Sequence, residues 1–165
     1  MPKLDAERSL AARVARSADL RDVRLFGVIA NLVSPVIDAG LTYSLSSNVE
    51  YQVLAEASVL IVTGSYELSV VEAAPSDDDA AKDDSEPAKV ADLSFQLAAL
   101  FDVPEPEDGA EPFEDKEYEA YAATTGQFVL YPYAREFVAE MTGRMGLPPL
   151  HLGALKFQLD GRNED

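Results

Sequence analysis

The chain has 165 residues, of which 47% are hydrophobic and none is cysteine, and its 30 acidic and 13 basic residues give a net charge of −17. A chain of this length buries about two thirds of its unfolded surface on folding, so we expect one domain with an apolar core. The lack of cysteine excludes disulfides and thiolate metal sites, and no apolar run approaches the roughly 18 residues that a membrane helix needs.

The start of the sequence does not resemble a secretory signal. The first 25 residues contain five arginines and no central apolar block. We therefore expect a cytoplasmic protein that does not insert into membranes.

The acidic residues are concentrated in two short stretches. Residues 72–87 hold seven and residues 105–119 hold eight, with Lys82 and Lys116 as the only basic residues among them. The rest of the chain is close to neutral. Because proteins bind phosphate backbones through Lys and Arg, this distribution argues against nucleic-acid binding.

The pattern of the first 33 residues predicts a short helix followed by a strand. Residues 4–18 place apolar side chains on one helical face: Leu4, Leu10, Ala11, Val14 and Ala18. Such a helix is expected to cover a sheet edge or a partner subunit. Residues 22–33 are apolar on both faces of an extended chain, which is typical of a strand covered on two sides.

Three further strands are predicted. Residues 41–46 alternate cleanly, so Leu41, Tyr43 and Leu45 share one face, and a break is expected between Ser47 and Leu54. Residues 56–71 are rich in β-branched side chains and predict a third strand. Residues 91–101 alternate and predict a fourth. The polar, Asp-rich run between the last two cannot bury enough surface to order itself, so we expect a flexible acidic loop at 73–88.

The C-terminal third predicts helix. A second acidic loop at 102–113 precedes a helical start at 113–123, which Gly126 is expected to interrupt. Pro132 suits the first turn of the next helix, whose apolar stripe comprises Ala134, Phe137, Val138, Met141 and Met145. Gly146 offers a left-handed cap, and Pro148 and Pro149 forbid continuation. Strands followed by helix indicate an α+β fold with a four-stranded antiparallel sheet packed by a long broken C-terminal helix.

One stretch resembles a known family. The run LYPYARE at 130–136, followed by a helix and then LPPLHL at 147–152, is similar to the corresponding segment of SecB chaperones. The layout of that family matches from about residue 22 to residue 157. The resemblance implies a single SecB-like domain over residues 1–165, with the stretch at 102–113 as its crossover loop and the short N-terminal helix as an addition.

The function that the resemblance implies is that of an ATP-independent holdase, without enzymatic activity or cofactor. Such proteins bind unfolded client polypeptides, either preproteins for export or an antitoxin, through apolar grooves in a homotetramer built as a dimer of dimers. By position in the resemblance, the groove residues are Leu41, Tyr43, Leu45, Val103, Phe113, Leu155, Phe157 and Leu159. Phe137 and Met141 on the long helix are predicted at the oligomer interface. A sheet covered on one side only would also expose apolar surface, which indicates an interface.

The sequence departs from the family at its tail and in its extra elements. After Phe157 only LDGRNED remains, which is too short for the family's terminal helix and lacks the basic segment through which export-type members contact the motor SecA. The acidic loop and the N-terminal helix are additional. These departures favour a toxin–antitoxin chaperone over the general export factor and weaken the case for SecA as a partner.

Two other functions fit single features of the sequence. The one histidine, His151, lies between two leucines, and a small hydrolase would use it with a carboxylate, but no G-x-S-x-G nucleophile motif accompanies it. The charge alone suggests an acidic protein that mimics nucleic acid and inhibits a DNA-binding partner. The aspartates from Asp77 to Asp84 lack the glycine and glutamate register of a calcium loop, so no metal site is predicted.

Overall fold

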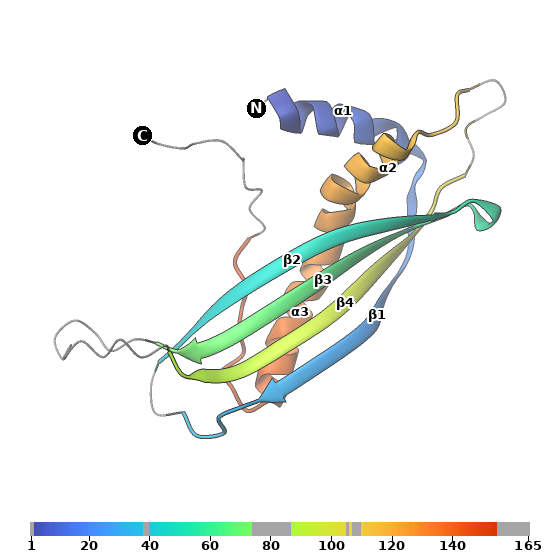
Figure 1. Ribbon diagram of the computed structural model, residues 1–165. Coiled ribbons are helices and arrows are strands. Elements are labelled where there is room, and N and C mark those ends of the chain that lie inside the picture. Colours follow the sequence, from blue (N-terminus) through green and yellow to red (C-terminus); the bar gives the residue numbers. More distant parts are fainter. Residues whose placement is uncertain (1, 38–39, 74–86, 105, 107–109, 155–165) are drawn as a thin grey trace.

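The computed structural model describes residues 2–37, 40–73, 87–104, 106 and 110–154. The chain runs through α1 (Pro2–Ser17), β1 (Asp19–Leu32), β2 (Leu41–Leu54), β3 (Val59–Glu72), β4 (Lys89–Asp102), α2 (Asp115–Tyr121) and α3 (Gln127–Arg144). The predicted α+β architecture is confirmed: a four-stranded antiparallel sheet carries its long helix on one face (Figure 1).

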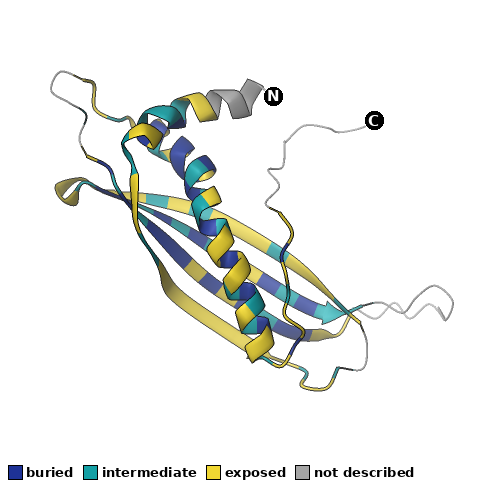
Figure 2. Cartoon of the chain, turned by 180° about the vertical axis from the view of Figure 1, so that it is seen from behind, coloured by how far each residue is buried: buried dark blue, intermediate teal, exposed yellow. Residues whose placement is uncertain are grey.

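The sheet has the strand order β1-β4-β3-β2, so β3 and β4 are central and β1 and β2 form the edges. Every second side chain of the central strands faces the helices and is buried, as in the opposed pairs Leu60 and Phe101, or Leu68 and Leu93. Figure 2 shows α3 crossing this face diagonally, over a band of buried residues. The core therefore lies between α3 and the two central strands.

The edge strand β2 is longer than the sequence predicted. No break occurs between Ser47 and Leu54, because the strand pairs with β3 without a register shift along its whole length. The turn comes later, at a 3-10 helix over Ala55–Ala57 that Ser58 closes in the left-handed conformation, with φ 51°. The two strands thus form one long, regular hairpin.

The expectation that β1 is covered on both faces is wrong for the single chain. Most of its apolar side chains remain exposed, with Ile29 65% and Phe26 55% accessible, and Val23 is half-buried. Among the described residues the strand pairs only with β4, and it carries two register shifts, between Leu20 and Asp22 and between Leu25 and Gly27. Figure 2 shows that most of this strand is exposed.

The expectation that Gly126 interrupts the helix is also wrong. α2 continues into α3 through a π-helical stretch, Ala122–Gly126, and Pro132 lies inside α3 rather than in its first turn. A Cβ on Gly126 would lie 2.8 Å from Val62 Cγ1. The glycine is therefore required for close packing of the helix on β3.

The end of α3 follows the sequence prediction. Gly146 has φ +80° and caps the helix, and the chain then turns back through Pro148 and Pro149. Within the helix, the Arg144 guanidinium donates to Glu140 Oε1, four residues earlier, at 2.7 Å.

α1 packs on α2 rather than on a sheet edge (Figure 1). Ala11 and Val14 are buried in the common core. Arg13 Nη1 donates to both carboxylate oxygens of Glu117 on α2, at 3.1 and 3.0 Å. None of the described helices is both long and apolar enough to cross a membrane.

Replacing Gly126 by Ala is expected to destabilise the fold by about 1–3 kcal/mol, since the added Cβ overlaps Val62 in a packed core. The measurement is urea denaturation. Gly143→Ala in the same helix is the matched control, because its Cβ would lie 3.7 Å from Pro149 Cγ, an ordinary contact, and alanine favours helix. Equal stability of the two variants would contradict the packing role of Gly126.

Candidate functional site

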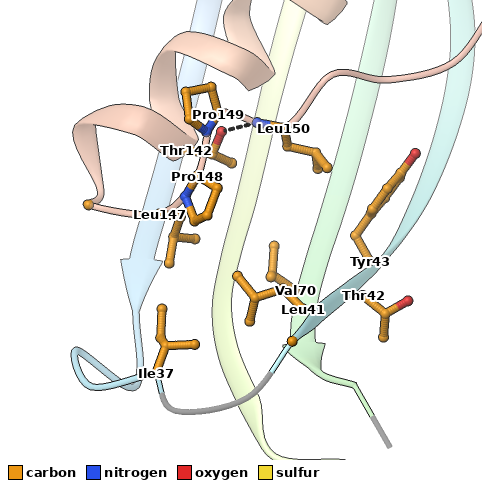
Figure 3. A pocket seen from close by; sticks show the side chains of 12 residues that line it. Ile37, Leu41, Thr42, Tyr43, Val70, Thr142, Leu147, Pro148, Pro149 and Leu150 are labelled. Carbon is orange, nitrogen blue, oxygen red and sulfur yellow. Dashed lines mark hydrogen bonds between the residues drawn. The ribbon is translucent and has the colours of Figure 1, made fainter. Parts of the chain in front are cut away.

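An apolar hollow lies between the first residues of β2 and the segment that follows α3. Its volume is about 590 Å³. Its lining comprises Ile37, Gly40, Leu41, Thr42, Tyr43, Val70, Thr142, Gly146, Leu147, Pro148, Pro149 and Leu150 (Figure 3). Aliphatic and proline side chains dominate this lining, so the hollow is suited to apolar groups rather than to charged ligands.

The segment after α3 is held in place by Thr142. This buried side chain donates to the Val138 carbonyl at 2.8 Å and accepts the Leu150 backbone N–H at 2.9 Å (Figure 3). Further along, the Tyr131 hydroxyl donates to the Gly153 carbonyl at 2.5 Å, and Leu152 is buried in the core. These contacts fix one wall of the hollow while the proline pair keeps that wall extended.

β2 supplies the opposite wall. Leu41, Tyr43 and Leu45 share the face of the sheet that carries the helices, as predicted from their alternation, and the first two line the hollow. Tyr43 remains 42% exposed, whereas Leu41 and Leu45 are half-buried. The Ser44 side chain between Tyr43 and Leu45 is exposed on the opposite face. β2 thus presents apolar groups on one side only.

The same face of β2 continues to a second, shallower hollow of about 420 Å³ beside the π-helical stretch. Val49, Tyr51, Glu119, Ala122 and Ala123 contribute to its lining. The Tyr51 hydroxyl donates to the Asp115 carbonyl at 3.3 Å. Loss of solvation, followed by the nearby Asp115 and Glu119, raises the pKa of Tyr51 to about 12, so the hydroxyl stays protonated and neutral at physiological pH.

The edge strand β2 also has an unused backbone edge. Within the described residues it pairs with β3 alone. The unpaired N–H and C=O groups along this edge can accept an added extended chain.

Val103 and Phe113 lie at the other end of the sheet and do not line the larger hollow. Val103 is 6% exposed, and its N–H donates to the Ser58 carbonyl at 2.8 Å. Phe113 is half-buried against Tyr118 and Arg13. Leu155, Phe157 and Leu159 lie outside the described residues, as does most of the acidic loop.

Phe137 and Met141 are half-buried and pack toward the sheet. The Phe137 ring lies 4.7 Å from the Phe95 ring on β4, between centroids. Phe128 and Tyr133 on the same helix are more exposed. An interface between α3 helices of two subunits could therefore include Phe128 and Tyr133 as well as the predicted Phe137 and Met141.

His151 is exposed and borders a shallow hollow on the outer side of α3, with Arg135, Glu136 and Glu140. The imidazole donates no hydrogen bond to a described carboxylate and accepts none from a described hydroxyl, so nothing in the described part of the chain aligns it as a catalytic base. The described residues also contain no group of three or more His, Asp or Glu side chains that could hold a metal ion.

Sequence reasoning missed Thr142, on which the wall of the larger hollow depends. Threonine within a helix gave no signal of its own, because its second hydrogen bond is made to a residue eight positions away, beyond the proline turn. Leu147 and Pro149 also line the hollow and were not predicted there, because the sequence indicated only that the prolines end the helix.

The chain is similar to named chaperones of Mycobacterium tuberculosis, although no family model matches it. It is 41% identical to the SecB-like chaperone Rv1957 over 160 residues, which cover 92% of this chain and 84% of the relative. The same identity and coverage hold for the SecB-like chaperone MT2006 of a second strain.

Among solved structures, the chain is similar to Rv1957 in complex with a ChAD peptide from the Rv1956 HigA1 antitoxin. The TM-score is 0.74 at 36% identity, over 91% of this chain and 99% of that chain. With its sheet, its long helix and its sequence all agreeing with these relatives, the chain belongs to the SecB-like chaperone family.

Proposed function

We propose that this protein is an ATP-independent holdase that binds non-native polypeptides in the cytoplasm, as a single SecB-like domain over residues 1–165. The observation that carries the proposal is the pairing of an apolar hollow of about 590 Å³ with the free backbone edge of β2. Apolar hollows bind side chains, and a free strand edge binds the backbone of any extended sequence. Together they can bind many unfolded segments without specificity for one sequence.

The proposed client groove follows the helix-facing side of β2. Leu41 and Tyr43 line its better-formed end, and Leu45, Val49 and Tyr51 continue it toward α2. Val103 and Phe113 are proposed to contribute at the far end, and Leu155, Phe157 and Leu159 from the tail. A strand of this length spans roughly 14 residues at about 3.3 Å each, enough for an extended client segment.

We propose an antitoxin as the client, rather than preproteins for export. A relative of similar length and fold was solved with an antitoxin peptide, which supports this choice. The relatives are named as chaperones, so a hydrolase using His151 is not favoured.

We further propose a homotetramer built as a dimer of dimers. β1 is the natural site of the first contact, since its apolar side chains are exposed on both faces and its outer edge is unpaired among the described residues. Pairing of two β1 edges would extend the sheet and cover part of that surface. The second contact is proposed on α3, where Phe137 and Met141 are joined by the exposed Phe128 and Tyr133.

Replacing Tyr43 by Asp is expected to weaken binding of a labelled apolar peptide about tenfold or more, because a charge would enter an apolar hollow. Fluorescence anisotropy measures the affinity, and light scattering of a denatured client measures suppression of aggregation. Ser44→Asp is the matched control on the opposite face and is expected to leave both unchanged. Loss of the tetramer in Tyr43→Asp would assign the residue to assembly instead.

Replacing Thr142 by Val is expected to lower stability by about 1–2 kcal/mol and to weaken client binding, because the Leu150 N–H loses its acceptor and the hollow loses a fixed wall. Thr124→Val is the control, since the Thr124 hydroxyl donates only within its own helix, to the Ala120 carbonyl. Calorimetry and peptide anisotropy on both variants make the comparison. Unchanged peptide binding in Thr142→Val would show that this wall is not part of the client site.

Replacing Ile29 by Asp is expected to shift the assembly to smaller species in native mass spectrometry, because a charge would be placed on the proposed β1 contact. Ser46→Asp, on the exposed face of β2, should keep the wild-type mass. A wild-type protein that already has the mass of one chain would contradict the proposed assembly.

A further inference from the structure

Arg13 on α1 holds the end of the crossover loop by several contacts at once. Its Nη1 donates to both oxygens of the Glu117 carboxylate, at 3.1 and 3.0 Å, and its Nη2 donates to the Glu111 carbonyl at 2.6 Å. Its guanidinium carbon lies 5.3 Å from the centre of the Phe113 ring. One side chain thus joins α1, the loop end and α2.

Glu117 is well placed to keep this contact rigid. The residue is 4% exposed, and its Oε2 also accepts the Glu114 N–H at 2.8 Å as part of the capping box that starts α2. The carboxylate therefore cannot move away without uncapping the helix. Arg13 is thus held by a carboxylate, that of Glu117, whose own position is fixed by the helix cap.

The same contacts leave Phe113 half-buried. Arg13 lies over the ring, Tyr118 meets it edge-on at 5.8 Å between centroids, and the ring packs against the core. An apolar client side chain can reach the ring face under Arg13 only if the guanidinium leaves. The Arg13 side chain is 40% exposed, so it has solvent into which to move.

We propose that Arg13 is a positioning residue that restricts the access of clients to Phe113, and that apolar client side chains bind there by displacing its guanidinium. This inference rests on the proposed function and deepens it. α1 then acts as a regulator of one end of the groove. A client that needs only the hollow beside Tyr43 is insensitive to Arg13, whereas a longer apolar client is not.

The expected change in client affinity on removal of Arg13 follows from the fraction of molecules in which Arg13 does not cover Phe113. Cation–π and partly exposed ion-pair contacts favour the covered state by a factor of about three to ten. Apparent affinity falls with the population of the competent state, so removing Arg13 should tighten binding by about the same factor.

The experiment compares Arg13→Gln with wild type for binding of an uncharged, labelled peptide that is apolar at alternate positions and long enough to span β2. We expect about three- to tenfold tighter binding. Added sodium chloride should reduce the difference, because salt screens the partly exposed pair with Glu117. Arg16→Gln is the matched control: it removes the same charge from an exposed position of the same helix and should bind like wild type.

Two further measurements separate this proposal from others. Hydrogen exchange at the Phe113 amide should be faster in Arg13→Gln than in Arg16→Gln, whether or not a client is present. Adding Phe113→Ser to Arg13→Gln should remove the gain in affinity. Arg13→Lys keeps one ion pair but not the bidentate geometry, so it should give a smaller gain in peptide affinity. It replaces Arg13→Gln in the experiment if that variant does not fold.

Folded Arg13→Gln that binds the peptide no better than wild type, or that exchanges at Phe113 no faster, would overturn the proposal. Wild-type protein that binds the peptide and suppresses aggregation in the same experiment keeps the holdase function in place. If wild type does neither, the proposed function fails as well, and the two failures are thereby distinguished.

Discussion

The structure depends on a mismatch of width between one helix and four strands. An α-helix with its side chains is about 10 Å across, whereas neighbouring strands are about 4.8 Å apart, so one helix covers about two strands. α3 lies over β3 and β4, whose helix-facing side chains are buried, and the edge strands stay partly uncovered. The close approach of Gly126 to Val62 fixes the helix over this central position.

The two uncovered edges differ in chemistry, and this difference gives them different uses. β1 is apolar on both faces, so it remains unfavourably exposed until another surface covers it. β2 alternates apolar and polar side chains and stays compatible with water on one face. A permanent contact is suited to the first edge, and a reversible one to the second.

The sequence predicted element types and faces better than it predicted their extent. The alternation of Leu41, Tyr43 and Leu45 was enough to place them on one face, because a strand has only two faces. The continuation of β2 to Leu54 could not be predicted, since Asn48, Glu50 and Gln52 are residues typical of loops. They fit in this strand because their side chains lie on its solvent-exposed face. Gly126 was predicted to break the helix because the need for glycine there comes from a tertiary contact, the proximity of Val62, which the local sequence does not show. Thr142 and Arg13 were missed for the same cause: their partners are distant in sequence.

The strand order has a consequence for how the chain is made. β2 and β3 are joined by a tight turn and can pair as soon as both have been synthesised, but β1 has to wait for β4, whose first contact with it joins Leu32 to Ala91. During translation β1, with its exposed apolar side chains, therefore emerges early and remains without its neighbour until much of the chain has followed. A newly synthesised chain therefore exposes apolar surface before it folds, as do the unfolded polypeptides that chaperones bind.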